Sequence, residues 1–193
     1  MDICVFGDSI TEGFFDDIGG GWVNRLKGYL ENKNSDYQVI NLGISGNTSA
    51  DLLNRIESDL KPLNPEIIVF SIGINDSQFQ HESKHSKVPL EQYKENLAKL
   101  YKIALTHTPN VIFLGLTDID EAKLTPIPWH TVASYFEADK NIYNEAVKEF
   151  CNQNNLKYIP MNGIISKTDV PDGAHPNAEG HEKIFEVVKD EII

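Results

Sequence analysis

Five short apolar runs, separated by stretches of helical periodicity, are the feature of this 193-residue chain that most limits its fold. A parallel strand that is covered on both faces reads as a continuous apolar run. The first, third and fourth runs do so, while the second and fifth are more polar. Strands that alternate with helices predict a parallel sheet with helices on both faces. The runs cover Ile3–Phe6, Tyr37–Leu42, Ile67–Ile72, Val111–Leu116 and Leu156–Met161.

Helical patterns fill most of the segments between these runs. Thr48 and Asp51 have the spacing of a capping box, and Pro89 and Pro176 suit a first helical position. The segment Thr117–Val132 differs, because it carries two prolines and no clear period, and a loop of that length is often functional. The apolar residues that recur at helical spacing are Leu52, Leu53, Ile56 and Leu60; Tyr93, Leu97, Leu100, Tyr101 and Ala104; Ile142, Ala146, Val147, Phe150 and Cys151; and Ile184, Phe185, Val188 and Ile192.

The charge and composition exclude several classes of partner. A formal net charge of -12 argues against nucleic acid and against an anionic membrane surface, and it leaves neutral or cationic substrates open. No apolar run is long enough to span a bilayer, so we expect no membrane insertion. The length fits one domain over residues 1–193. Cys4 and Cys151 are expected to be buried, reduced thiols. Because a strand-like run begins almost at Met1, we expect no signal peptide and a cytoplasmic location.

Chemistry-bearing residues follow the predicted strands, where an open α/β sheet binds its ligands. A serine, an asparagine, several glycines, and an aspartate close to a histidine collect there. An acyl-transfer site needs a nucleophile, a base, a group that orients the base and donors for the oxyanion. Asp172 can accept the Nδ1 proton of His175 and leave Nε2 facing Ser9. The segments are Gly7–Gly13, Gly43–Asn47, Gly73–Asp76, the long loop with Trp129 and His130, and Asp172–Pro176.

Four of these blocks, in this order, resemble the conserved blocks of the SGNH hydrolases, also called GDSL esterases and lipases. Ile10 stands where the family nickname has Leu, and this conservative change is the only departure. The blocks are Gly7-Asp8-Ser9-Ile10-Thr11-Glu12-Gly13, Asn41-Leu42-Gly43-Ile44-Ser45-Gly46, Gly73-Ile74-Asn75-Asp76 and Asp172-Gly173-Ala174-His175-Pro176.

The resemblance implies a flavodoxin-like, three-layer α/β/α sandwich and a serine esterase that needs no cofactor and no metal. Ser9 would be the nucleophile, His175 the base and Asp172 its orienting partner. The oxyanion hole would consist of the Ser9 N–H, the Gly46 N–H and the Asn75 side-chain amide. Gly46 is expected at the start of the capped helix, where free N–H groups point outward. Residues expected to contact the small-molecule ester substrate are Asp8, Trp129 and His130.

The sequence disfavours three other classes of protein. A flavodoxin-like nucleotide or flavin binder would need a phosphate loop after the first strand, but that loop carries Asp8 and Glu12 and no cation. A non-catalytic module of the same fold is disfavoured because every catalytic position holds a competent residue. A metal hydrolase is disfavoured because His81 and His85, although spaced i,i+4, lie in a polar loop that is expected to be solvated.

The substrate is less well determined than the reaction. Short acyl esters are the expected substrates, with thioesters, lysophospholipids and acetylated carbohydrates as alternatives on the same site. The apolar residues of the segment 117–136 could form an acyl wall, or they could simply pack that segment onto the body of the protein. These residues are Leu124, Ile127, Trp129 and Phe136. The sequence leaves the oligomeric state open.

Overall fold

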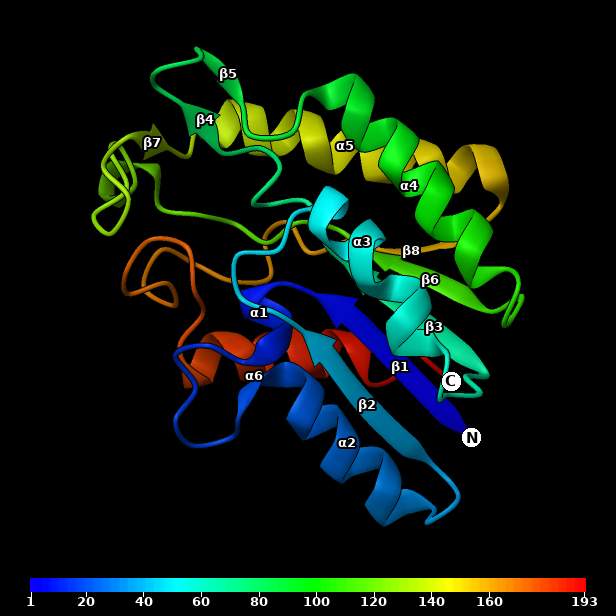
Figure 1. Ribbon diagram of the computed structural model, residues 1–193. Coiled ribbons are helices and arrows are strands. Elements are labelled where there is room, and N and C mark those ends of the chain that lie inside the picture. The colour runs from blue at the N-terminus through cyan, green and yellow to red at the C-terminus, as the bar shows by residue number, and fades with distance from the viewer.

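A five-stranded parallel sheet forms the centre of the computed structural model, which describes all of residues 1–193 (Figure 1). Each of the five predicted apolar runs forms one strand. In sequence order they run 2-1-3-4-5 across the sheet, which is the flavodoxin-like order and confirms the predicted fold. The strands are β1 (Asp2–Gly7), β2 (Gln38–Gly43), β3 (Ile67–Ser71), β6 (Val111–Leu114) and β8 (Lys157–Ile159), in the spatial order β2-β1-β3-β6-β8.

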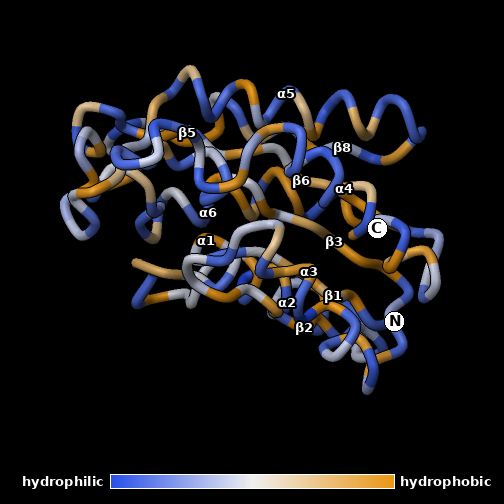
Figure 2. Tube along the Cα trace, turned by 45° about the horizontal axis from the view of Figure 1, so that its top comes forward, coloured by the Kyte–Doolittle hydropathy of each residue, from blue (hydrophilic) through white to orange (hydrophobic).

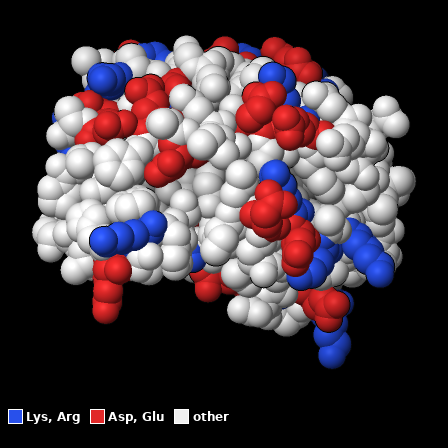
Figure 3. Space-filling model, turned by 90° about the horizontal axis from the view of Figure 1, so that it is seen from above, with Lys and Arg blue, Asp and Glu red and all other residues white.

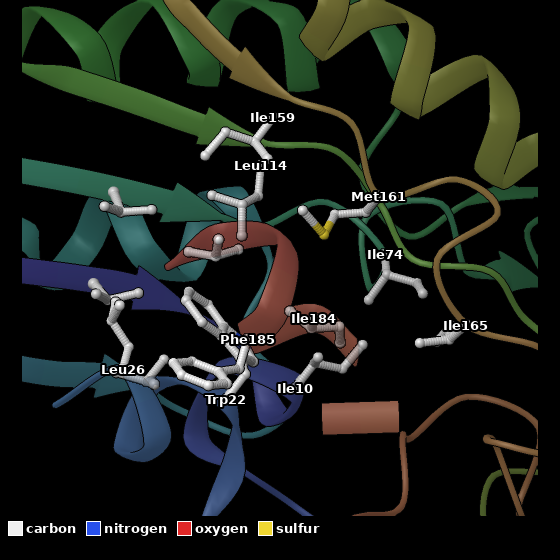
Figure 4. Close-up of a cluster of buried hydrophobic side chains, with 14 of the residues drawn as sticks. Ile10, Trp22, Leu26, Ile74, Leu114, Ile159, Met161, Ile165, Ile184 and Phe185 are labelled. Carbon is white, nitrogen blue, oxygen red and sulfur yellow. The ribbon is translucent and has the colours of Figure 1, made fainter. Parts of the chain in front are cut away.

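Helices cover both faces of the sheet. Figure 1 shows α2 (Gly21–Lys33) and α6 (Ala178–Val188) on one face, and α3 (Ser49–Leu60), α4 (Leu90–Ala104) and α5 (Glu137–Asn154) on the other. Each face has its own hydrophobic cluster. Trp22 of α2 and Phe185 of α6 pack in the first cluster (Figure 4), while Tyr93 of α4 packs in the second. Each fully buried side chain of this size contributes about 1.5–3 kcal/mol through the hydrophobic effect.

The polarity of the elements follows this layering. Figure 2 shows hydrophobic colour along β3, which is covered on both faces, and an alternation of polar and apolar residues along α5. Figure 3, which looks onto the outer face over α4 and α5, shows acidic side chains with basic ones beside them. Helices α4 and α5 each contain ion pairs along their own length, as between Lys94 and Glu91 (2.9 Å) and between Lys148 and Glu145 (3.1 Å). No helix has both the length and the apolar character required to cross a membrane.

Helix starts agree with the sequence in part. The capping box before α3 is present, because the Thr48 side chain accepts from the Asp51 N–H and the Asp51 carboxylate accepts from the Thr48 N–H. The prolines lie further out than predicted: Pro89 is the N-cap of α4, and Asn177, not Pro176, caps α6. Helix α2 was not predicted, because it starts in a glycine-rich turn where no side chain caps it.

A second, small antiparallel sheet was also missed. Its strands β5 (His85–Ser86), β4 (Phe79–Gln80) and β7 (Ala133–Ser134) contain two residues each, which is too short for a period to be recognised. It joins the segment after β3 to the end of the long loop after β6 (Figure 1). His81 lies beside this sheet, where its Nε2 atom is 2.9 Å from the Ser134 hydroxyl.

The segment 117–136 mainly packs onto the body of the protein. It contains the short helix η1 (Glu121–Lys123) but no other helix. Leu124 and Ile127 are fully buried in the first hydrophobic cluster, and Phe136 packs edge-on against Phe79 with 5.6 Å between ring centroids. Only Trp129, with 52% of its surface exposed, remains free to face a ligand.

Candidate active site

Ser9 stands where β1 ends and the short helix α1 (Ser9–Glu12) begins. The Asp8 carboxylate caps this helix by accepting from the Ile10 N–H at 3.0 Å. The turn into the helix is tight, since a Cβ atom at Gly7 would overlap Thr11 and the Ser71 carbonyl oxygen. Ser9 is therefore held at the carboxyl edge of the sheet, with only 6% of its surface exposed.

The Ser9 hydroxyl, the His175 ring and the Asp172 carboxylate form a continuous chain of hydrogen bonds. Ser9 Oγ lies 2.9 Å from His175 Nε2, and His175 Nδ1 lies 2.6 Å from Asp172 Oδ2. A carboxylate only accepts, so Nδ1 carries the proton and Nε2 is free to accept from the serine hydroxyl. This is the arrangement that a general base requires.

The loop that carries Asp172 and His175 is organised by the carboxylate itself. Asp172 Oδ1 accepts from the backbone N–H of Ala174 (2.9 Å) and of His175 (2.8 Å). Burial opposes ionisation of Asp172, but the hydrogen bonds from the His175 ring and from these two N–H groups outweigh it and lower its pKa. Gly173, at φ +100°, allows the turn that brings the carboxylate back to the imidazole.

Three aromatic rings surround His175. The centroid of its ring lies 4.9 Å from that of Phe14, 6.0 Å from that of Phe15 and 5.6 Å from that of Trp129. The segment with Phe14 is held by His181, which is completely buried and whose Nε2 lies 3.1 Å from the Phe14 carbonyl oxygen. The rings of Phe14, Phe15 and Trp129 are about half exposed, so they form an apolar mouth around the imidazole.

Three donors that could stabilise an oxyanion lie on the loops after β1, β2 and β3. The Ser9 and Gly46 N–H groups donate to no other backbone or side-chain group of the protein, and the Asn75 amide makes only one donated bond, to the Asn47 carbonyl oxygen at 3.1 Å. Gly46 was expected at the start of α3, but the structure places it outside that helix. It lies three residues before Ser49 in a turn at φ +79°, a conformation that suits glycine.

The loop with Asn75 is tied to α3 by the next residue, Asp76. This carboxylate is fully buried, and both its oxygens accept from the Ser49 N–H at 3.0 Å. Burial raises the pKa of Asp76 to about 6, although the hydrogen bonds from Ser49 oppose this rise. Asp76 therefore fixes the Asn75 loop against the helix that follows Gly46.

A pocket of about 700 Å³ opens over these groups. Trp129 and His130 lie in its lining, as expected of substrate contacts, and Lys87 brings a cation. The lining also includes residues that were not expected to contact a ligand, four of which (Ile10, Ser45, Ile74 and Ala174) belong to the sequence blocks. The full lining adds Ile10, Phe14, Phe15, Ser45, Ile74, Gln78, Lys87, Tyr135 and Ala174 to Ser9, Gly46, Asn75, Asp172 and His175.

Asp8 is not part of this lining, contrary to the expected substrate contact. Only 3% of its surface is exposed, and its carboxylate faces inward as the cap of α1. Burial raises the pKa of Asp8 to about 7, while the Ile10 N–H and His175 oppose the rise. Asp8 thus caps the turn that carries Ser9 and does not reach the pocket.

The fold and the site define a class, the GDSL-type hydrolases, which have a flavodoxin-like sheet and a serine after the first strand. The model of the GDSL-like lipase/acylhydrolase family matches residues 5–183, and the chain belongs to that family. It is a carboxylic ester hydrolase.

Several similar proteins are esterases by name. Esterase TesA of Pseudomonas aeruginosa is 27% identical over 96% of this chain and 85% of its own length. An acetylxylan esterase of Geobacillus stearothermophilus is also 27% identical, over 91% of this chain and 86% of its own. A crystal structure of the acetylxylan esterase Axe2 from the same organism, a catalytic mutant, superposes with a TM-score of 0.79 over 99% of this chain and 93% of that one, at 23% identity. This last likeness concerns the fold.

Proposed function

We propose that this enzyme hydrolyses carboxylic esters with short acyl chains by a serine mechanism centred on Ser9. The observation that carries the proposal is the continuous hydrogen-bond chain from Ser9 Oγ through the His175 ring to Asp172, with separations of 2.9 and 2.6 Å. Each link has the donor and acceptor that proton transfer requires.

In the first half of the reaction, Ser9 Oγ bonds to the ester carbonyl carbon while its proton moves to His175 Nε2. The carbonyl oxygen becomes an oxyanion, which would accept from the Ser9 N–H, the Gly46 N–H and Asn75 Nδ2. The bond to the leaving oxygen then breaks, and His175 gives its proton to the departing alcohol. In the second half, His175 Nε2 takes a proton from water as the water oxygen bonds to the acyl carbon. The bond from that carbon to Ser9 Oγ then breaks, and His175 returns the proton to Ser9 Oγ, which releases the acid and restores the free enzyme.

Two observations support a preference for short acyl chains. Of the four apolar residues that could have built a long acyl wall, Leu124 and Ile127 are fully buried in the core and Phe136 packs against Phe79. Trp129 alone lies in the pocket lining. Each CH₂ group buried from water would contribute about 0.8 kcal/mol, so a longer chain would gain only where it reaches the apolar lining near Phe14, Phe15 and Trp129. Leu124, Ile127 and Phe136 add no further wall beyond that lining.

A specific observation favours acetylated carbohydrates as a second candidate substrate. The half-exposed rings of Phe14, Phe15 and Trp129 stand at the pocket mouth around His175, where a flat apolar surface could stack against a sugar ring. Two similar proteins, from Geobacillus stearothermophilus and Xylanibacter ruminicola, are acetylxylan esterases. The reaction and the residues that perform it would be the same.

The test is the activity of Ser9→Ala on p-nitrophenyl acetate, with Ser58→Ala on the exposed side of α3 as the matched control. Ser9→Ala should lose activity and keep its melting temperature, while the control keeps both. The substrate is tested by kcat/KM across acetyl, butyryl, octanoyl and palmitoyl esters beside acetylated xylo-oligosaccharides. A steady rise toward palmitoyl would contradict the short-chain proposal, and activity retained by Ser9→Ala would contradict the mechanism.

A further inference from the structure

Tyr135 lies directly behind the proposed oxyanion hole. Its hydroxyl donates to Asn75 Oδ1 at 2.8 Å, and 5% of the residue is exposed, at the pocket wall. Tyr135 follows β7 at the end of the long loop, 60 residues after Asn75 in the chain. Nothing in the sequence blocks marks this tyrosine, and the proposed mechanism makes no use of it.

The two partners of Asn75 decide which way its amide faces. The Asn47 carbonyl oxygen can only accept, so the group 3.1 Å from it must be the NH₂ of Asn75. The amide oxygen then points to Tyr135, whose hydroxyl supplies the proton. One hydrogen of Asn75 Nδ2 is donated to the Asn47 carbonyl oxygen, so the other remains available for a ligand in the pocket. Without the tyrosine hydroxyl, only the single bond to Asn47 would orient the amide.

Tyr135 is well suited to act as a permanent donor. Burial raises the pKa of its hydroxyl, and the carboxylates of Asp8, Asp76 and Asp172 raise it further against an opposing hydrogen bond with Gln78, so the hydroxyl keeps its proton at neutral pH. The small sheet holds it in place, because β7 pairs with β4 through Ser134 opposite Phe79, four residues after Asn75. The same sheet thus anchors both partners of the hydrogen bond.

We propose that Tyr135 is a positioning residue for the oxyanion hole, whose hydroxyl fixes the Asn75 amide with its NH₂ group toward the pocket. The small sheet β5-β4-β7 then serves to hold Tyr135, which belongs to the segment after β6, against the loop after β3. The proposal rests on the proposed function, because it gives Asn75 the role of stabilising an oxyanion.

The experiment measures kcat and KM on p-nitrophenyl acetate for Tyr135→Phe, Asn75→Ala and the double variant. Loss of one oxyanion donor typically lowers kcat by about 10²–10³. Tyr135→Phe leaves the Asn75 donor in place but poorly oriented, so it should lower kcat by less, about tenfold, with KM nearly unchanged. In the Asn75→Ala background, Tyr135→Phe should change kcat by less than about twofold, because the group it positions is gone.

Tyr158→Phe is the matched control. The Tyr158 hydroxyl also donates to an asparagine Oδ1 atom, that of Asn144 at 3.1 Å, but away from the pocket lining. This variant should keep the wild-type kcat. As a second variant, p-aminophenylalanine at position 135 restores a donor and should recover most of the lost kcat, which tests the proposal even where Tyr135→Phe folds poorly.

The outcomes separate this proposal from the proposed function. A wild-type kcat for Tyr135→Phe, a change in KM alone, or an equal loss in the Asn75→Ala background would each overturn the positioning role. If any of these results accompanies an inactive Ser9→Ala, the serine mechanism stands and only the role of Tyr135 fails. If Ser9→Ala stays active, the proposed function fails first.

Discussion

Replacing Asp172 by asparagine would test how the carboxylate controls the imidazole. The Asp172 Oδ1 atom accepts from two backbone N–H groups, so an asparagine at this position should keep its oxygen there. Its NH₂ group would then replace Oδ2, 2.6 Å from His175 Nδ1, and would donate to that nitrogen. The ring proton would move to Nε2, which faces Ser9 and could no longer accept the serine proton.

The expected loss follows from that wrong tautomer. In serine hydrolases with this triad geometry, such a change lowers kcat by about 10⁴, which corresponds to about 5 kcal/mol of transition-state stabilisation. Because the loop keeps both backbone bonds, the melting temperature of Asp172→Asn should change little.

The assay is kcat on p-nitrophenyl acetate together with thermal unfolding, with Asp36→Asn in the exposed turn before β2 as a control of equal charge change. The control should keep its activity. A loss of less than about tenfold in a folded Asp172→Asn protein would refute the reasoning, since a wrong tautomer cannot serve as the base.

Three further predictions concern single side chains. Asn75→Ala should lower kcat by about 10²–10³ with KM nearly unchanged; a rise in KM alone, seen in steady-state kinetics, would instead place Asn75 in substrate binding. Burial opposes ionisation of Asp16, but bonds from Arg25 and from two loop N–H groups lower its pKa to about 2. The folded state thus favours the ionised carboxylate of Asp16, which adds to the free energy of unfolding. This contribution is fully present above the pKa of the carboxyl in the unfolded chain, near 3.8, and is lost as the pH falls toward 2. Asp16→Asn should therefore lower the free energy of unfolding by about 2 kcal/mol at pH 7 and by less at pH 3, and equal losses at both pH values in urea titrations would contradict this. The pKa of Asp8 is raised to about 7, so its stabilising contribution is greatest below pH 3.8 and falls as the pH rises through 7. Asp8→Asn should therefore raise the melting temperature at pH 8 but not at pH 3, and a lower melting temperature at pH 8 would show that the ionised carboxylate is needed.

The sequence predicted the elements whose physical signal is local. Buried parallel strands read as apolar runs, so all five strands of the parallel sheet were predicted, and the capping box at Thr48 located the start of α3. Ser9 and Asn75 could be placed at the carboxyl edge of the sheet because each follows a predicted strand. His175 could be placed there because it belongs to a short motif after the last predicted strand. The hydrogen-bond chain from Ser9 through His175 to Asp172 was expected from the order of the strands, the short spacing of Asp172 and His175, and the resemblance to the family.

The features that the sequence did not reveal depend on contacts between distant segments. The strands of the small sheet contain two residues each, and their pairing brings Tyr135 to Asn75 across 60 positions. Phe14 and Phe15 belong to an irregular loop, so no period indicates that they pack on His175. Asp8 was expected to contact the ligand, but in the structure it caps α1. In the sequence both roles look alike, as an acidic residue at the end of a strand. The predicted cytoplasmic location and the absence of a nucleic-acid partner stay predictions.

The most direct test of the serine mechanism is covalent labelling with a fluorophosphonate ester, followed by peptide mass spectrometry. This reagent reacts with a serine that an adjacent base activates, and its phosphonyl oxygen occupies the oxyanion position. The account predicts one adduct per chain, located on Ser9, with no labelling of Ser9→Ala and greatly slowed labelling of Asp172→Asn. An adduct on another residue, or equal labelling of Ser9→Ala, would contradict it.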